Sequence, residues 1–274
     1  MTDEGFRARV AHVERAARAG ADVASEGYEA GPVAETKGGA DRVVHASDVV
    51  TAADRNAQRA VTDSIRERFP DDAVVGEEGD AAKTVPDTGI AWVVDPIDGT
   101  YNFVRGLPSW STAVALTVDG EAVAAATVAP AMDRTYLVAD GEATRDGTRI
   151  RVADRTDPET FAVAYTFVPE LAEREDYADG VAAMLHRFGE VRRVGSLQVV
   201  LALVASGALD GAVTDAHVNP WDSVGGVALV RAAGGVVTDL DGDPWTRDSA
   251  GLVASTGTAH DELLAVGRRM AGRR

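Results

Sequence analysis

Two aspartates on one short segment are the residues whose types and spacing most directly suggest chemistry. The apolar residues 92–94 are typical of a buried strand, and Asp95 follows at its end. Pro96 disfavours a helical conformation at Asp95, so the chain is expected to stay extended there. Asp98 comes three residues after Asp95. We therefore predict that the end of this strand presents two carboxylates on one rigid turn.

The two residues after Asp98 add a flexible glycine and a hydroxyl. Gly99 lets the backbone turn sharply, and Thr100 offers a hydroxyl to a water or to an oxygen bound to a metal. Carboxylate and hydroxyl oxygens in this arrangement suit Mg²⁺ and phosphate. The segment therefore predicts a metal-dependent phosphatase, and further acidic ligands are needed to complete the site.

Three other acids have a local context that distinguishes them from the remaining acidic residues. Asp54 falls in the first turn of a predicted helix and Asp222 opens another, where an acid is favoured by the helix dipole alone. Glu77 follows the short strand 73–76, shortly before the Asp95 strand, so that two strand ends could converge. Each acid has an ordinary structural explanation when taken singly, and Glu78 is an additional candidate because it adjoins Glu77.

Composition limits the class of protein. A chain of 274 residues with 45% hydrophobic content can bury a sizeable core, and no apolar run approaches the length of a membrane span. The first 20 residues are a charged amphipathic pattern without the apolar stretch of a signal peptide, so a cytoplasmic location is expected. Cysteine is absent, which excludes disulfides, thiolate zinc sites and cysteine nucleophiles.

The charge balance is strongly acidic, with 44 acidic against 27 basic residues and a net charge of −17. Such a surface repels nucleic acid and anionic lipid, so neither is expected as a partner. Because the acids are scattered, adaptation to a salt-rich cytoplasm is favoured over a general cation-binding role.

The elements that must position these acids change character along the chain. A helix is predicted over residues 2–29, another over 51–69, and an antiparallel meander of strands over 111–152. After the polar run 153–160, strands and helices alternate as in a layered α/β unit. We therefore predict an α+β half over residues 1–152, carrying most of the candidate ligands. An α/β half over residues 153–274 would carry Asp222 and a substrate loop.

Three ordered motifs resemble the signatures of the inositol monophosphatase superfamily. They are GEE at 76–78, DPIDGTYNF at 95–103 and WDSVGGVALVRAAGG at 221–235, and the segments 49–54 and 146–152 also match in order and type. The superfamily includes inositol monophosphatases, archaeal fructose-1,6-bisphosphatases and 3′-phosphoadenosine phosphatases. The resemblance implies a layered αβαβα sandwich with mixed sheets and flanking helices. Together with the strongly acidic composition, it suggests a halophilic archaeon as the source.

The resemblance also implies a role for each matched residue. The site would hold two or three Mg²⁺ ions, and Asp95 would bridge two of them. Asp54 and Thr100 would hold the water that attacks phosphorus directly. The backbone N–H groups of Gly99 and Thr100 would cradle the phosphate. The implied metal ligands are Glu77, Asp95, the carbonyl group of Ile97, Asp98 and Asp222.

Substrate contacts match less completely. Gly195, Ser196 and Asp215 match family positions that meet the substrate, but Leu197 stands where a small residue usually follows the serine and could reshape the polyol pocket. Lys37 resembles a loop lysine near the metals, although the segment from it to Asp54 is longer here.

Arg192 and Arg193 precede this substrate loop and have two interpretations. They are either ordinary solvated strand residues, or one of them, such as Arg193, holds a second phosphate.

The expected activity is Mg²⁺-dependent hydrolysis of inositol 1-phosphate or a similar small polyol or sugar phosphate, by a homodimer. The alternatives are a fructose-1,6-bisphosphatase, which could be the same protein, a 3′-phosphoadenosine phosphatase, and a catalytically silent metal-binding relative. A haloacid-dehalogenase phosphatase is disfavoured because its two aspartates are two residues apart, whereas Asp95 and Asp98 are three apart.

Overall fold

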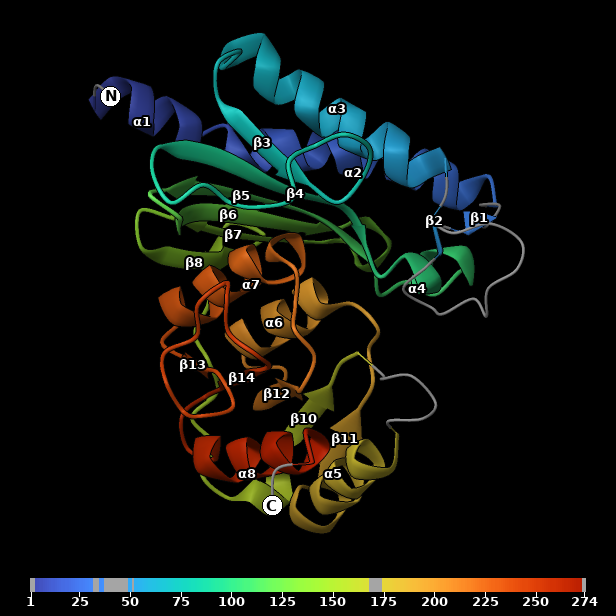
Figure 1. The fold of residues 1–274 in the computed structure, drawn as a ribbon, viewed down its shortest axis with the longest axis vertical. Helices are drawn as coiled ribbons and strands as arrows, with labels where there is room; N and C mark the ends of the chain where they lie inside the picture. Colours follow the sequence, from blue (N-terminus) through green and yellow to red (C-terminus); the bar gives the residue numbers. More distant parts are fainter. Residues whose placement is uncertain (1–2, 32–34, 37–48, 51, 168–173, 273–274) are drawn as a thin grey trace.

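The computed structural model describes residues 3–31, 35–36, 49–50, 52–167 and 174–272. These residues form five layers, in which helices alternate with two large sheets (Figure 1). The predicted sandwich of mixed sheets and flanking helices is therefore confirmed. Lys37, which the sequence suggested as a loop lysine near the site, lies outside the described residues. The division at residue 152 stays a prediction.

Eight α-helices and two short 3₁₀ helices occur in the described part of the chain. Their bounds are α1 Asp3–Val10, α2 Val13–Glu29, α3 Ala52–Arg68, α4 Thr100–Val104, η2 Pro130–Met132, η3 Pro158–Thr160, α5 Arg174–Arg187, α6 Leu197–Ala205, α7 Pro220–Ala232 and α8 His260–Met270.

The strands form two large sheets and one small pair, β1 (Glu35–Thr36) with β2 (Val49–Val50). The seven-stranded sheet has the order β3-β4-β5-β6-β7-β8-β9 and the five-stranded sheet the order β11-β10-β12-β14-β13. Their bounds are β3 Ala73–Gly76, β4 Ile90–Asp98, β5 Ser111–Val118, β6 Glu121–Ala129, β7 Arg134–Ala139, β8 Glu142–Arg145, β9 Thr148–Arg149, β10 Ala162–Tyr165, β11 Glu190–Arg192, β12 Gly211–Thr214, β13 Val236–Thr238 and β14 Leu252–Ser255.

The seven-stranded sheet is buried on both faces, because alternate residues of its central strands belong to different cores. Trp92 and Val94 of β4 pack with α2 and α3, whereas Ala91 and Val93 pack with α6 and α7. The face toward α6 and α7 is rich in alanine, which lets these helices approach closely. This packing brings α7, and with it Asp222, against the sheet that carries Asp95.

The five-stranded sheet lies between α6 and α7 on one side and α5 and α8 on the other (Figure 1). Its strands β10, β11 and β12 are parallel, and β13 and β14 complete it with antiparallel pairs. The carboxyl ends of the three parallel strands therefore meet at one edge, as is common for ligand sites in α/β sheets.

Two sequence predictions differ from the structure. The helix predicted over 2–29 is interrupted at residues 11–12, where the buried His12 ring bonds Ser64 and packs edge-on to Trp92. The last strand of the meander ends at Arg149 rather than at residue 152, because the backbone N–H of Val152 bonds the carbonyl of Ala233 instead of a neighbouring strand. Within the described residues, every helix is too short or too polar to cross a membrane.

Candidate active site

Parallel pairing of β3 with β4 brings Glu77 beside Asp95. Gly76 is in register with Val94, and the N–H of Glu77 donates to the carbonyl of Val94 at 3.3 Å. Glu77 is therefore the first residue beyond β3, at the level where β4 presents Asp95. The predicted convergence of the two strand ends is confirmed.

The end of β4 is irregular, and this irregularity presents both aspartates. The strand continues through Pro96 to Asp98, but its register with β5 shifts between Asp95 and Asp98. The hydroxyl of Thr112 donates to the carbonyl of Pro96 at 2.7 Å and fixes the bulge. Asp95 and Asp98 are only 1% and 5% exposed, so both carboxylates are held inside the protein.

Asp222 reaches the same place from the start of α7. Pro220 occupies the first turn of the helix, where its missing N–H costs nothing, and Asn219 is the N-cap residue. The side-chain amide of Asn219 donates to the carboxylate of Asp222 at 3.0 Å. The helix start thus fixes both the position and the orientation of this acid.

The carboxylates of Asp95, Asp98 and Asp222 offer ligand atoms that all lie within 4.8 Å of one another. We call these three residues together with Glu77 the carboxylate cluster, since the charge of Glu77 acts on each of the others. Both oxygens of Asp95 are buried without a hydrogen-bond partner among the described residues. Buried carboxylates that repel one another and lack donors are suited to a divalent cation.

The electrostatics of the cluster agree with that donor set. Burial and the charge of Glu77 raise the pKa of Asp95 well above its ordinary value, and the same two causes raise the pKa of Asp222. Burial raises the pKa of Asp98 to about 6, against the opposing effect of its hydrogen bonds. Without a cation the cluster therefore retains protons that ordinary carboxyls would release.

Asp98 is stabilised by the start of α6. Ser196 donates its hydroxyl to Asp98 at 2.5 Å, and the backbone N–H groups of Leu197 and Gln198 donate at 3.3 and 2.6 Å. Ser196 also accepts the N–H of Val199 and so caps the helix. In this structure the hydroxyl of Ser196 contacts a member of the carboxylate cluster, and its predicted contact with substrate stays a prediction.

The structure places Leu197 in the protein interior, and its effect on the polyol pocket stays a prediction. Its side chain is 2% exposed and belongs to the core between the two sheets. A leucine at the first position of α6 is buried there because the helix is apolar all round and lies between two sheets.

Asp54 and Thr100 are in contact, as the resemblance implies for a pair that holds one water. The hydroxyl of Thr100 lies 3.2 Å from a carboxylate oxygen of Asp54 and 3.1 Å from the carbonyl oxygen of Ile97. Asp54 is 1% exposed although it lies in the first turn of α3. A helix-dipole acid would normally face solvent, so its burial beside Thr100 indicates a more specific role.

Gly99 and Gly195 allow two loops to touch beside the cluster. Both have left-handed backbones, with φ of +89° and +86°. A Cβ atom on Gly99 would lie 3.1 Å from the carbonyl oxygen of Gly195, and one on Gly195 would lie 2.9 Å from the side-chain amide of Asn102. Asn102 in turn donates to the carbonyls of Ser109 and Val194, both at 2.7 Å. The turn that presents Asp98 is therefore fastened to the loop before α6.

The carboxyl ends of β11 and β12 carry the remaining substrate candidates. Arg193, just after β11, is exposed, and Asp215, just after β12, is half-buried. Both act electrostatically on Tyr177, whose pKa is raised chiefly by burial. Arg192 instead bonds Glu190 at 2.5 Å and projects from the sheet as an ordinary solvated residue.

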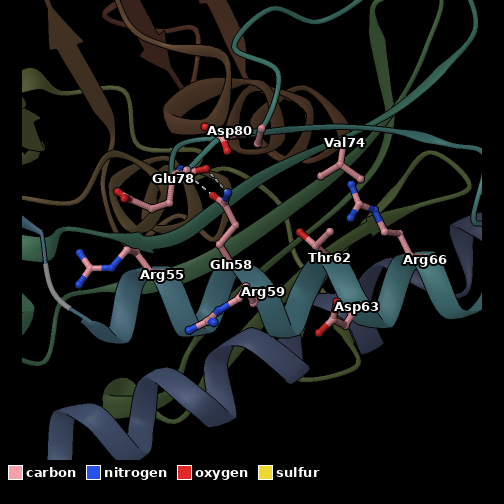
Figure 2. Close-up of a pocket in the computed structure, with 11 residues that line it drawn as sticks. Arg55, Gln58, Arg59, Thr62, Asp63, Arg66, Val74, Glu78 and Asp80 are labelled. Atoms are coloured by element: carbon pink, nitrogen blue, oxygen red, sulfur yellow. Dashed lines mark hydrogen bonds between the residues drawn. The ribbon is translucent and has the colours of Figure 1, made fainter.

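Three residues that the sequence did not indicate support the cluster. Gln58 on α3 bonds the backbone of Glu78, which is itself buried (Figure 2). Gln198 bonds the carbonyl of Trp221 at 2.7 Å, directly before Asp222. Lys83 donates to the carbonyls of Gly76 and Glu77, each at 2.8 Å. No motif marks these residues, because their role depends on contacts between distant segments.

A pocket of about 660 Å³ lies on the α3 side of Glu78 (Figure 2). Its lining includes Arg59 and Arg66 from α3, and Gly79 and Asp80 from the segment after Glu78. It contains no member of the carboxylate cluster. The pocket is therefore distinct from the candidate active site, and Gln58, which bonds Glu78, is among its lining residues.

A family model described as "Inositol monophosphatase family" matches residues 7–271. The chain belongs to this family. The match covers nearly the whole molecule, including every member of the carboxylate cluster, and it agrees with the resemblance that the motifs suggested.

The relatives of this chain are named for different functions. A fructose-1,6-bisphosphatase/inositol-1-monophosphatase of Thermotoga maritima is 35% identical over 80% of this chain and 82% of its own length. The Nus factor SuhB of Escherichia coli is 30% identical over 92% of each chain. Among solved structures, a Thermotoga maritima IMPase is 32% identical, covers 94% of this chain and 96% of its own, and superposes with a TM-score of 0.82.

Family membership indicates that this member is a phosphatase acting on a phosphorylated small molecule. The family is generally metal-dependent, and the carboxylate cluster provides the acidic groups that such a dependence requires. The names of the relatives differ between inositol phosphate and fructose bisphosphate, so they leave the substrate open.

Proposed function

We propose that the chain is a Mg²⁺-dependent phosphomonoesterase that hydrolyses inositol 1-phosphate or a closely similar polyol or sugar phosphate. The observation that carries the proposal is Asp95, whose two buried oxygens have no hydrogen-bond partner among the described residues and face other acids. A divalent cation would compensate this arrangement at a pH where the carboxylates are ionised, and a phosphatase uses such a cation on its substrate.

Each member of the site has a proposed role. Two or three Mg²⁺ ions would polarise the phosphoryl oxygens and lower the pKa of a bound water. Thr100, whose hydroxyl donates to the carboxylate of Asp54, would accept a hydrogen bond from the attacking water. Gly99 and Thr100 would donate backbone N–H groups to the phosphate. The groups that would hold the ions are Glu77, Asp95, the carbonyl of Ile97, Asp98 and Asp222.

The polyol end of the substrate would lie at the carboxyl ends of the parallel strands β10, β11 and β12. Asp215 follows β12 and would accept hydrogen bonds from substrate hydroxyls. Gly195 and Ser196 come from the adjoining loop, which contacts the phosphate end at Gly99. This placement would let one substrate span the junction between the two sheets.

Phosphate release is the direct test. The purified protein would be assayed in high KCl with Mg²⁺ on inositol 1-phosphate, fructose 1,6-bisphosphate and adenosine 3′,5′-bisphosphate. We expect the first to be hydrolysed with the highest kcat/KM. Absence of release from all three, with or without Mg²⁺, would leave only a silent metal-binding relative.

Fructose-1,6-bisphosphatase is the second candidate, favoured by Arg193. This guanidinium is exposed and, like Asp215, acts electrostatically on Tyr177, so a second phosphate could bind there. Arg193→Gln is then expected to lower kcat/KM for the bisphosphate by about tenfold and to leave the inositol monophosphate nearly unchanged. Arg192→Gln is the matched control, because Arg192 is paired with Glu190. Equal effects of the two substitutions would remove the second-phosphate role.

The oligomeric state and the location are further parts of the proposal. We infer a cytoplasmic homodimer that acts on a small phosphorylated metabolite and binds neither nucleic acid nor membrane, in keeping with the net charge of −17. Light scattering coupled to size-exclusion chromatography would test the dimer: a monomer mass at working concentrations would contradict it.

A further inference from the structure

We propose that Gln58 and Gln198 are positioning residues that hold the backbone beside two members of the carboxylate cluster. They are the only glutamines in the chain, and both are buried, at 8% and 1% exposure. The inference rests on the proposed function in one respect, namely that the cluster binds divalent ions.

Gln58 fixes the segment that carries Glu77. Its side-chain amide donates to the carbonyl of Glu78 and accepts the N–H of the same residue at 2.7 Å (Figure 2). Two bonds to one residue fix its backbone in both directions. Gly76, on the other side of Glu77, leaves room for the glutamine, since a Cβ there would lie 2.8 Å from its amide oxygen. Glu77 is therefore flanked by two residues that both contact Gln58.

Lys83 bonds the opposite edge of this segment. Its ammonium group donates to the carbonyls of Gly76 and Glu77 at 2.8 Å each. Glu77 thus lies in a short stretch of backbone fixed from two sides, by an amide and by an ammonium.

Gln198 connects the two helices that meet at the cluster. Its backbone N–H donates to Asp98 at 2.6 Å, and its side-chain amide donates to the carbonyl of Trp221 at 2.7 Å. Trp221 immediately precedes Asp222. A single residue therefore sets the start of α7 relative to Asp98, and a displacement of its side chain would move one ligand away from the other.

Gln198 carries an energetic penalty, which argues against a purely stabilising role for this residue. Its amide oxygen is buried without a hydrogen-bond partner among the described residues. A Cβ on Gly226 would come within 2.9 Å of that oxygen, so the adjoining helix has no bulk there. An unsatisfied buried acceptor costs about 1–3 kcal/mol, which an apolar side chain of the same length would avoid. The hydrogen bond that the NH₂ group of the same amide donates to the carbonyl of Trp221 explains why a polar side chain is present despite this penalty.

Glutamine is the side chain that suits both places. A glutamate would add another negative charge beside carboxylates that already repel one another, and it could not donate to the carbonyls of Glu78 or Trp221. Methionine and leucine could fill the volume but form neither bond. A neutral amide fixes the backbone and leaves the charge of the cluster unchanged.

The test uses Gln58→Met and Gln198→Met in the full chain, with Mn²⁺ as the probe ion. The Mn²⁺ dissociation constant, measured by electron paramagnetic resonance, is expected to rise about tenfold in each variant, the lower end of the range for outer-shell partners of metal ligands. Unfolding in the presence of EDTA would be measured in parallel. The melting temperature of the metal-free protein should fall no further than in Thr117→Val, which loses a buried hydroxyl bond to Ala91 remote from the cluster.

The outcomes separate positioning from packing. A lowered melting temperature with an unchanged Mn²⁺ dissociation constant would overturn the inference. Gln58→Leu and Gln198→Leu repeat the measurement where methionine is not tolerated, and failure of both substitutions at one position to fold would also overturn it. If the wild-type protein itself bound no Mn²⁺, the proposed function would fail instead, so the two failures are distinguishable.

Discussion

Asp95 is the residue on which the site depends most. It lies at the end of β4, its oxygens have no hydrogen-bond partner among the described residues, and Glu77, Asp98, Asp222 and Asp54 all raise its pKa after burial itself. The folded protein pays a penalty for this carboxylate unless a cation is present. Substitution of Asp95 should therefore separate stability from activity.

Asp95→Asn is expected to lower kcat/KM by more than about 100-fold, beyond the usual effect of an outer-shell partner, while the metal-free protein melts at a higher temperature than wild type. The reason is that the amide removes one negative charge from the cluster without changing its volume. Phosphate release and thermal unfolding in EDTA would measure the two effects.

A control separates loss of the ligand from damage to the fold. Mg²⁺ should raise the melting temperature of the wild-type protein and should no longer do so in Asp95→Asn, since only the native cluster binds the ion. Full activity in the variant would remove Asp95 from the metal site.

At this scale the sequence could indicate residue types but few contacts. The spacing of Asp95 and Asp98 predicted one turn, but only the family resemblance connected that turn to Asp222. Gln58 and Gln198 could not be identified, because no local sequence pattern distinguishes a buried positioning glutamine from a glutamine on the surface. The burial of Leu197 could not be identified for a related reason, because it depends on packing between two sheets.

The turn from β4 into α4 is constrained at Gly99 by both its backbone conformation and its surroundings. Gly99 has φ of +89°, and a Cβ there would meet the side chain of Ser196 at 3.0 Å and the carbonyl of Ser109 at 3.1 Å. Gly99 must be glycine for two reasons, its left-handed backbone and the close contacts that a Cβ atom there would make. The two can be separated by comparison with a glycine that has the left-handed backbone but no close contacts at its Cβ position.

Gly99→Ala is expected to destabilise the protein by more than about 2 kcal/mol, because the left-handed conformation and a displaced loop both cost free energy. Activity should fall as well, since the loop of Gly195 must move. Urea unfolding and phosphate release would measure these effects.

Gly141→Ala is the matched control, with φ of +75° and open space around its Cβ position. It should cost only about 1 kcal/mol and leave activity unchanged. Equal destabilisation in the two variants would show that the contact with the Ser196 loop is unimportant.

Elements with strong periodicity were predicted well. The strand over 73–76 has the expected bounds, and the meander is antiparallel as expected. The break at residues 11–12 was missed, because the helical pattern continues on both sides and only the contacts of His12 with Ser64 and Trp92 reveal it. Tertiary contacts thus decided what local pattern could not.

At the scale of the whole molecule, the carboxylate cluster links stability to pH and to metal. Rising pH is expected to destabilise the metal-free protein, and a bound metal ion is expected to stabilise it. Asp98 has a pKa of about 6, and the pKa values of Asp95 and Asp222 are also raised. The metal-free folded state therefore holds protons that the unfolded chain releases above about pH 4. Raising the pH through this interval favours the unfolded state.

The free energy of unfolding in EDTA is accordingly expected to fall as the pH rises from about 4 to above 6, at constant ionic strength. Saturating Mg²⁺ should reduce or reverse that fall, since the ion binds the deprotonated carboxylates. Urea titrations at several pH values with and without Mg²⁺ would measure it. A metal-free protein that gained stability over this interval would contradict the raised pKa values.

The net charge of −17 gives a second prediction at this scale. Raising KCl from about 0.1 M to about 1 M shortens the screening length from about 10 Å to about 3 Å, so self-repulsion should weaken and the melting temperature should rise. The same rise in Asp95→Asn would assign it to the surface, whereas a rise confined to wild type would assign it to the cluster. A flat or falling melting temperature would contradict salt adaptation.

The core between the two sheets has a consequence for the order of events in folding. Asp222 meets Asp95 and Asp98 only where α7 packs on the seven-stranded sheet, so we expect the complete cluster to be among the last native contacts to form. A bound cation should then slow unfolding while leaving the refolding rate almost untouched. The ion would stabilise the native state kinetically, and its dissociation would limit how long the folded protein persists.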